Sequence, residues 1–359
     1  MKRDATGKGA QAGRLRLRSF DILEEKTMTG ITRRGFLRAG AVGAASAAAG
    51  LRFGIGAAHA AGVEARWASL SPGFTLMVTK YIIAKHLDEK NGLKLGDPTN
   101  YTSVGTYYQD FVAGTYDVCI GTWDTFAARY LAGVPVQLVC TITTGDMINM
   151  IAPAGGAGGV KELAGKTLAT LQSSGTYRLT KALLKEYQGI DLEKFATVQN
   201  VDNPAAAATL VMANRADAAL TWEPNVSTAI SKVPGIKVIY NAGEEYRART
   251  GLDLPYFSVA IRKELATRNP GVARMVNQAF ADCLAGINAN IDEAVAIGGA
   301  GTRIPPDVLK LAMSSKRLQF KHGSVADPAV RKSVLLAAEM LQRNGGLSRK
   351  LDDAFFAAA

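Results

Sequence analysis

The sequence predicts an α/β protein with two lobes that face each other across a cleft. Short apolar runs of strand length alternate with helical patterns from residue 64 to residue 261. Such alternation is typical of a mainly parallel sheet with helices on both faces. In addition, a unit made of a helix end, a polar turn and a buried strand occurs twice, at 111–124 and at 209–224. Two copies in one chain suggest two lobes.

Each copy of this unit places an aromatic ring and a carboxylate directly after its strand. The second copy, TLVMANRADAALTWEP, has a strand at 218–220 followed by Trp222 and Glu223, and Pro224 then stops the ladder. The first copy, FVAGTYDVCIGTWD, ends in Trp123 and Asp124. Core packing is the ordinary role of one such tryptophan. Ligands bind beyond the carboxyl ends of strands in open α/β sheets, so two copies favour a shared binding cleft.

The other elements follow in order. In the first lobe we expect strands at 64–70, 101–104, 118–122 and 136–142, with helices at 74–91, 107–114 and 125–132. The glycine-rich stretch 153–159 is expected to be a loop just past a crossing between the lobes. The second lobe has predicted strands at 167–171, 198–201, 218–220 and 237–240, a helix at 177–188 and another from Pro204. A strand at 256–261 returns to the first lobe, and helices follow at 270–289, 291–299, 305–314 and 327–344.

These elements predict three parts of the chain. Residues 1–61 form an export signal with an N-terminal extension. The first lobe covers 62–151 and 253–359, and the second lobe covers 152–252.

Residues 1–61 carry the features of a twin-arginine signal peptide. The segment 32–38, TRRGFLR, matches the pattern [ST]-R-R-x-F-L-[KR]. An Ala/Gly-rich run at 39–51 follows, and Ala58-His59-Ala60 fits the small-x-small cleavage pattern. The run is too poor in large apolar residues to span a membrane. We therefore expect a mature protein that begins near Ala61 and resides in the periplasm.

The charge of the chain gives no support to nucleic-acid binding. The net charge is +11, but residues 1–61 hold 11 of the 42 Lys and Arg and 4 of the 31 Asp and Glu, so the remainder has a net charge of +4. Nucleic-acid binding needs basic residues concentrated on one face. We expect no nucleic-acid partner.

Cysteine and histidine are too few for a metal centre. The three cysteines, Cys119, Cys140 and Cys283, match no zinc or redox spacing. Cys119 and Cys140 each lie in an apolar run, and placement on neighbouring strands would allow a disulfide, although buried thiols are the simpler interpretation. After loss of the signal only His86 and His322 remain. We expect no metal and no cofactor.

Two polar loops are candidates for the cleft. Ser173, Ser174, Gly175 and Thr176 lie between a strand and a helix N-terminus, where hydroxyls and free backbone N–H groups can hold an anionic oxygen. The alternative is that Ser174 or Thr176 only caps the helix. Ser69 and Ser71 occupy the matching position in the first lobe, so the two loops would face each other.

Motifs for catalysis are missing from the sequence. Gly165-Lys166-Thr167 leads into a strand and has Val160 where a phosphate-binding loop needs glycine. The glycines of 155–159 lack the context of a dinucleotide fingerprint, and no G-x-S-x-G elbow occurs. We therefore expect a protein that is not an enzyme.

The chain resembles the periplasmic solute-binding proteins of ABC importers, in the nitrate, sulfonate and taurine group that includes binders of thiamine-pyrimidine precursors. The resemblance covers about 63–345. It rests on the paired units at 113–121 and 212–221, on Trp222-Glu223-Pro224, on LAGKT at 163–167 and on GVPV at 133–136. It implies the type II periplasmic binding protein fold, in which two lobes joined by two strands close on a solute by hinge motion. It also implies an ABC permease and its ATPase as partners, and we expect a monomer.

By analogy with this group, four loops line the cleft. The expected ligand-binding residues are Ser69, Ser71, Phe74, Thr122, Trp123, Asp124, Ser173, Ser174, Gly175, Thr176, Trp222 and Glu223. Because the charges named at the cleft are two carboxylates and Arg178 as the one candidate cation, the sequence favours an organic solute with an amine or ring N–H over plain nitrate.

Two alternatives stay open. One is an enzyme on the same fold that acts on a pyrimidine-like compound, which the resemblance ties to a histidine in the cleft and a cysteine-rich iron motif. The other is a sensor partner that presents its bound solute to a receptor. The sequence does not distinguish transport from sensing, because both need a closing cleft.

Overall fold

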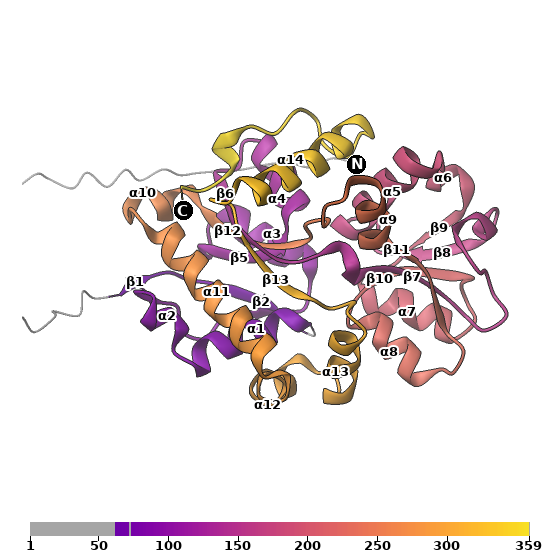
Figure 1. Ribbon diagram of the computed structural model, residues 1–359, viewed down its shortest axis with the longest axis horizontal. Helices are drawn as coiled ribbons and strands as arrows, with labels where there is room; N and C mark the ends of the chain where they lie inside the picture. The colour runs from indigo at the N-terminus through magenta and orange to yellow at the C-terminus, as the bar shows by residue number, and fades with distance from the viewer. Residues whose placement is uncertain (1–61, 72, 359) are drawn as a thin grey trace, which may run out of the picture. The chain divides into compact units, whose positions relative to one another are not determined.

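The computed structural model describes residues 62–71 and 73–358, and Figure 1 shows its helices and strands. The predicted export signal at 1–61 lies outside the described residues. None of the helices in the described ranges is long and apolar enough to cross a membrane.

A four-stranded sheet in the order β13-β6-β12-β5 forms the centre of the first lobe. Its strands are β5 (Val118–Thr122), β6 (Val136–Thr143), β12 (Phe257–Arg262) and β13 (Phe320–Ser324). A parallel bridge from Trp67 to Val118 brings the strand pair β2 (Ala68–Leu70) and β4 (Thr99–Tyr101) to the edge at β5. The short strands β1 (Val63–Glu64) and β3 (Leu93–Lys94) pair beside them. Because β12 is antiparallel to both β5 and β6, those two strands run in the same direction.

The second lobe has a five-stranded sheet in the order β11-β7-β10-β8-β9. Its strands are β7 (Ile148–Ala152), β8 (Thr167–Thr170), β9 (Thr197–Asn200), β10 (Ala218–Trp222) and β11 (Lys237–Asn241). The pairs β8–β9 and β8–β10 are parallel, and β7 is antiparallel to β10 and β11. In this five-stranded sheet only β7 runs against the other four strands, so the mainly parallel sheet that the sequence predicts is confirmed in strand direction. In the four-stranded sheet β12 and β13 run against β5 and β6, so the prediction is wrong there. Every pair of neighbours in the four-stranded sheet is antiparallel.

We call residues 62–143 and 257–358 the first lobe and residues 148–250 the second lobe, according to these sheets. The boundary predicted at residue 152 falls at the end of β7, a strand that pairs in the second sheet. The division of the chain into two functional lobes remains our proposal.

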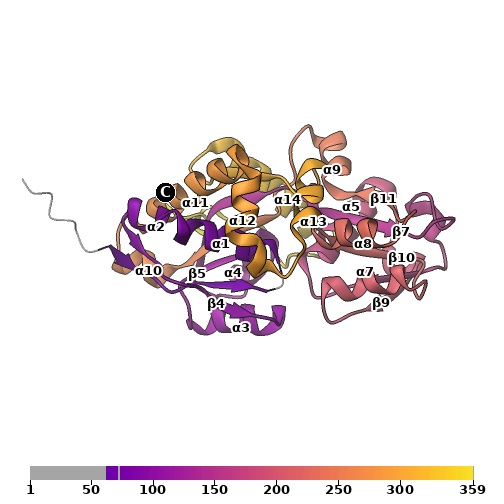
Figure 2. The same ribbon diagram turned by 90° about the horizontal axis from the view of Figure 1, so that it is seen from below.

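Helices cover the sheets (Figures 1 and 2). Those of the first lobe are α1 (Phe74–Ala84), α2 (Leu87–Lys90), α3 (Val104–Ala113), α4 (Trp123–Leu131), α10 (Lys263–Arg268), α11 (Val272–Ala289), α12 (Ile291–Thr302), α13 (Pro306–Ser314) and α14 (Pro328–Arg343). Those of the second lobe are α5 (Gly175–Gln188), α6 (Leu192–Phe195), α7 (Pro204–Met212), α8 (Asn225–Lys232) and α9 (Ala242–Thr250). Short 3-10 helices occur at η1 (Gly145–Met147), η2 (Val160–Leu163) and η3 (Asp353–Phe355).

Capping residues set several helix boundaries. Ser103 accepts a hydrogen bond from the Thr106 N–H and begins α3, so the strand predicted at 101–104 ends earlier, at Tyr101. Gly114 then ends α3 in the left-handed conformation, with φ 82°. The helix predicted at 74–91 is two helices. Residues 84–86 are exposed, and His86 takes a positive φ of 51° that breaks the helix there.

The chain passes between the lobes through two neighbouring connections, 144–147 and 251–256. The Gly145 N–H donates to the Leu254 carbonyl at 2.8 Å, and Thr144 and Pro255 form an antiparallel bridge. Asp146, in the first connection, accepts hydrogen bonds from Thr144 Oγ1 at 2.6 Å and from Arg247 Nη2 of α9 at 2.7 Å. The two connections are thus joined to each other and anchored to the second lobe.

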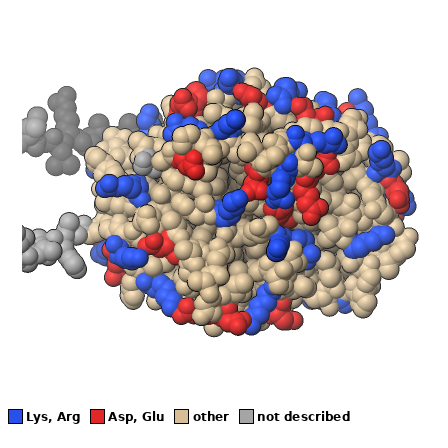
Figure 3. All heavy atoms as spheres, in the orientation of Figure 1, with Lys and Arg blue, Asp and Glu red and all other residues tan. Residues whose placement is uncertain are grey.

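Acidic and basic side chains are interspersed over the face of the molecule shown in Figure 3. On this face no large patch of one sign is seen.

All three cysteines are buried and free, and we expect them to stay unpaired in the native protein. β5 and β6 are not neighbours, because β12 lies between them and pairs Cys119 with Ala260 and Cys140 with Val259. Two strand spacings amount to about 9–10 Å, too far for a disulfide. Burial raises the pKa of Cys119 to about 12, and it also raises the pKa of Cys140 and Cys283. A thiol reagent should therefore label three cysteines after denaturation and almost none before. A Cys119–Cys140 disulfide in non-reducing peptide mapping would contradict this arrangement.

Candidate functional site

A cavity of about 340 Å³ lies between the lobes. The first lobe contributes the β2–α1 connection, the start of β12 and the α12–α13 connection. The second lobe contributes the start of α7 and the segment from the end of β10 into α8. Its lining residues are Leu70, Ser71, Gly73, Phe74, Thr75, Thr102, Val104, Asn203, Pro204, Ala205, Trp222, Pro224, Asn225, Thr228, Lys232, Phe257, Arg303, Ile304 and Pro305.

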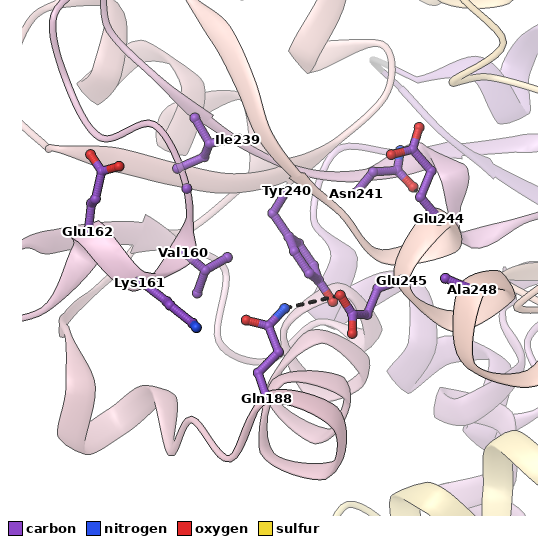
Figure 4. A pocket seen from close by; sticks show the side chains of 11 residues that line it. Val160, Lys161, Glu162, Gln188, Ile239, Tyr240, Asn241, Glu244, Glu245 and Ala248 are labelled. Atoms are coloured by element: carbon purple, nitrogen blue, oxygen red, sulfur yellow. Dashed lines mark hydrogen bonds between the residues drawn. The ribbon is translucent and has the colours of Figure 1, made fainter.

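A larger hollow of about 510 Å³ lies elsewhere, on the second lobe alone (Figure 4). It is lined by η2, the end of α5, β11 and α9, with Gln188 and Glu245 hydrogen-bonded to each other at 3.1 Å. Since all of its walls belong to one lobe, a hinge motion would not close it. The cavity between the lobes is therefore the better candidate for a solute site.

Three aromatic rings, those of Phe74, Trp222 and Phe257, line the cavity. Phe74 starts α1 and packs edge-on against Phe257, with ring centroids 4.8 Å apart. Trp222, the last residue of β10, is half-buried and reaches the cavity from the second lobe. Of the residues predicted from the sequence, Ser71, Phe74 and Trp222 line this cavity. Such rings offer a large apolar surface to an organic solute.

A second set of predicted residues meets in a direct contact between the lobes. Asp124, in the first turn of α4, lies against Gly175, the first residue of α5. A β-carbon on Gly175 would come within 2.4 Å of Asp124 Oδ1 and 2.6 Å of Thr122 Oγ1. The Thr176 hydroxyl is hydrogen-bonded to Tyr256, whose pKa is raised by burial. These residues form a packed boundary, and none of them lines the 340 Å³ cavity.

The end of β5 is held in place for this contact by tyrosine hydroxyls. Tyr108 accepts a hydrogen bond from the Thr122 N–H at 3.1 Å, and Tyr107 accepts one from the Ile120 N–H at 3.1 Å. Both rings are buried against β5. These two hydrogen bonds fix the position of Asp124 where it contacts the second lobe.

Both carboxylates of the repeated unit form ion pairs across the lobe boundary. Asp124 Oδ2 accepts a hydrogen bond from Arg178 Nε of α5 at 2.6 Å, and the charge of Asp124 raises the pKa of Arg178. Glu223 Oε1 accepts one from Arg317 Nε, in the α13–β13 connection, also at 2.6 Å. Both carboxylate side chains are 0% exposed.

Glu223 is held further by Ser227 of α8. The Ser227 N–H donates to Oε2 at 3.0 Å and the Ser227 hydroxyl donates to Oε1 at 2.9 Å. Both carboxylates are therefore already bonded to protein groups and are not available to bind a solute amine. These contacts argue against the amine recognition that the sequence favours.

The remaining predicted residues have structural contacts. Trp123 is completely buried, and its indole N–H donates to the Pro255 carbonyl at 2.7 Å. Ser69 is buried and donates to the Thr75 hydroxyl at 3.3 Å. Ser174 caps α5 by accepting a hydrogen bond from the Tyr177 N–H at 3.2 Å, which is the capping role given above as the alternative for this loop. Ser173 is exposed.

Sequence reasoning missed most residues of the cavity, among them Phe257, Arg303 and Lys232. Phe257 had no signal beyond its place at the start of a strand. Arg303 falls between two helical patterns, ahead of Pro305 and Pro306, which mark a loop without showing what it faces. Lys232 ends a helix that the sequence patterns did not indicate. Arg317, the partner of Glu223, was also missed.

The described residues contain no group of three or more His, Cys, Asp or Glu side chains that could hold a metal ion. His86 is exposed, and the His322 ring is hydrogen-bonded to Asn277 at 3.1 Å.

Comparisons with known proteins address the family and the fold. A family profile described as "NMT1/THI5 like" matches residues 79–294. No curated protein sequence matches the chain.

Three solved structures resemble the chain along most of its length. The alkanesulfonate-binding protein SsuA from Xanthomonas axonopodis pv. citri, bound to MOPS, is 15% identical, with 80% of this chain and 95% of that chain covered and a TM-score of 0.64. The periplasmic aliphatic sulphonate binding protein SsuA from Escherichia coli is 16% identical, with 80% and 90% covered and a TM-score of 0.64. The ligand-binding component of an ABC-type import system from Staphylococcus aureus, with zinc bound, is 13% identical, with 82% and 96% covered and a TM-score of 0.63. At these identities the likeness establishes the fold, which is the predicted periplasmic binding protein fold.

Proposed function

Since the chain belongs to the NMT1/THI5-like family, we propose that it is the substrate-binding component of an ABC importer. It captures a small organic solute between its lobes and delivers it to a membrane permease and its ATPase. It acts in the periplasm as a monomer, after export through the twin-arginine pathway.

The observation that carries this proposal is a cavity whose walls come from both lobes. Trp222 and Lys232 belong to the second lobe, and Phe74 and Phe257 belong to the first. The lobes are joined by two adjacent connections, so rotation about 144–147 and 251–256 would open or close the cavity. Solute would enter when the lobes part and would be enclosed when Asp124 and Gly175 meet.

The aromatic wall supports an organic solute over a bare inorganic ion such as nitrate. We propose a sulfonate or taurine-like compound or a nitrogen-containing heterocycle. Ser71, Phe74 and Trp222 would contact it directly. Thr122, Asp124, Gly175 and Thr176 would hold the lobes in the closed arrangement, while Ser69, Trp123, Ser174 and Glu223 would shape the walls.

The protein is proposed to bind its solute without changing it. The enzyme alternative calls for a histidine in the cleft, and neither described histidine, His86 or His322, lines the cavity. A sensor role would use the same cleft and differ only in the partner.

A ligand screen with a cavity variant tests the proposal. Thermal unfolding is followed with taurine, alkyl sulfonates, nitrate, aminopyrimidines, aromatic carboxylates and short amides. A solute at a hundred times its Kd should add about 2.7 kcal/mol of stability and raise Tm by several degrees. Trp222→Ala should abolish the shift, because the indole supplies a large part of the apolar contact area. Tyr240→Phe, in the hollow of Figure 4, is the control and should respond as the wild type.

Two results would count against the proposal. If no compound shifts Tm, or if Trp222→Ala keeps the full shift, the cavity is not a solute site. If mass spectrometry finds a compound chemically changed after incubation, the protein is an enzyme.

A further inference from the structure

We infer that the solute is an amphipathic organic anion whose charged group binds between Arg303 and Lys232. Its apolar body would lie against Phe74, Trp222 and Phe257. This inference rests on the proposed function and names the class of solute.

The charges on the cavity wall are the first support. Arg303 and Lys232 are its charged lining residues, and no Asp or Glu is among the described residues that line it. Neither cation forms an ion pair within the ranges that the structure describes, whereas Arg178, Arg247, Arg317 and Lys321 each do. An anionic group bound between these two cations would be attracted by both.

The two cations come from different lobes. Lys232 is the last residue of α8 in the second lobe, and Arg303 follows α12 in the first lobe, where it takes a left-handed φ of 59°. An anionic group that contacts both would therefore link the lobes. Part of the binding free energy would then favour the closed arrangement of the lobes. A neutral solute would not link the two cations in this way.

The N-terminus of α1 adds positive potential at the same wall. Gly73 is its N-cap residue, no side chain of the described residues caps this helix, and its first turn contains no acidic residue. Gly73 and Phe74 both line the cavity. The free N–H groups and the helix dipole favour a negative group there. The neighbouring end of α7 differs, because Asn203 caps it and Pro204 has no N–H to donate.

The two carboxylates of the repeated unit do not offset these charges. Asp124 and Glu223 are fully buried, and each is neutralised by an arginine of the opposite lobe. A solute ammonium would meet two cations and no Asp or Glu among the described residues that line this cavity. The aromatic and aliphatic part of the wall then selects anions that carry an apolar body.

Calorimetric titration of the purified full-length protein with matched probes tests the inference. One aryl and one alkyl series are used, each with an anionic, a neutral and a cationic member: benzenesulfonate, benzenesulfonamide and benzylammonium, and hexanesulfonate, hexanamide and hexylammonium. The anions should bind most tightly, and their affinity should fall as salt is raised. Arg303→Gln should weaken sulfonate binding about tenfold, which corresponds to about 1.4 kcal/mol. Arg303→Lys should recover part of this loss.

The controls separate charge from folding. Arg303 and Arg215 are both exposed, and neither takes part in an ion pair among the described residues, but Arg215 lies away from the cavity. Arg215→Gln should leave every Kd unchanged. Arg303→Gln should leave the Kd of the neutral members unchanged, since they lack the group that it contacts.

The outcomes distinguish this inference from the proposed function. If neutral or cationic members bind as tightly as the anions and lose binding in Trp222→Ala, the solute-binding role stands and the anion inference is wrong. If the double variant Arg303→Gln/Lys232→Gln binds sulfonates as the wild type does, the inference is also wrong. If no probe of any charge and no compound of the wider screen binds, both the anion inference and the proposed solute-binding function are wrong.

Discussion

Replacing Arg178 with alanine is expected to lower the free energy of unfolding by about 3–5 kcal/mol, the range for removing one partner of a buried ion pair. Asp124 is 0% exposed, and its Oδ2 accepts the Arg178 hydrogen bond at 2.6 Å. Its other oxygen, Oδ1, has no hydrogen-bond partner in the described part of the chain. Without Arg178 a full negative charge would stay buried at the lobe boundary with no compensating cation.

Urea unfolding of four proteins measures this effect. Arg178→Ala should lose the full amount, and Asp124→Asn/Arg178→Ala should be more stable than Arg178→Ala alone, because the double variant no longer buries an unpaired charge. Arg215→Ala, at an exposed arginine that forms no ion pair with any residue the structure describes, should stay within about 0.5 kcal/mol of the wild type. A loss below about 1 kcal/mol for Arg178→Ala would show that Asp124 is solvated or protonated without its partner.

Gly175→Ala is expected to keep the lobes from meeting and to weaken solute binding at least about tenfold, or about 1.4 kcal/mol. The added methyl would lie 2.4 Å from Asp124 Oδ1 and 2.6 Å from Thr122 Oγ1, far inside contact distance. Neither neighbour can retreat easily. Asp124 is held by Arg178, and Thr122 is held through its backbone by Tyr108. Separation of the lobes is the remaining way to relieve the clash.

Small-angle X-ray scattering and calorimetry together check this prediction. Gly175→Ala should show a larger radius of gyration than the wild type in the presence of the best compound from the screen, together with the lower affinity. Gly159→Ala is a matched control, because a β-carbon there has no neighbour within 4 Å and its backbone is extended. If Gly175→Ala matches the wild type in both measurements, contact between α4 and α5 does not control closure.

The repeated unit predicted the local structure of both copies. Both strands, and the carboxylate that follows each, are where the repeat places them, because the pattern of helix end, polar turn and apolar strand is local. The strand at 256–261 was likewise expected to return to the first lobe, and β12 pairs there with β5 and β6.

The repeated pattern could not predict that the two tryptophans have different surroundings. Trp123 is buried with its N–H bonded to the Pro255 carbonyl, whereas Trp222 reaches the cavity. What covers each ring comes from a segment distant in sequence. The same is true of the arginines: Arg317 lies 94 residues from Glu223. Arg303 reaches the cavity through the α12–α13 connection, and no local spacing indicates that contact.

Strand β7 shows a second limit of prediction from sequence patterns. Residues 148–152, INMIA, are apolar except for Asn149 and show no regular alternation, and in the structure all five are buried. Such a run is consistent with a fully buried strand, but periodicity does not distinguish it from a buried helix segment. The predicted parallel arrangement also gave no reason to expect antiparallel insertion of β7 or β12. That insertion follows from the two crossings between lobes.

A crystal structure of the protein with the compound that shifts Tm most would test the central claim most directly. The claim is that solute binds between the lobes, in the cavity shared by Phe74 and Trp222. The account predicts electron density for the compound between these rings, its anionic group within hydrogen-bond distance of Arg303, and Asp124 still paired with Arg178. Density in the hollow of the second lobe near Tyr240, or at any site lined by one lobe alone, would contradict it.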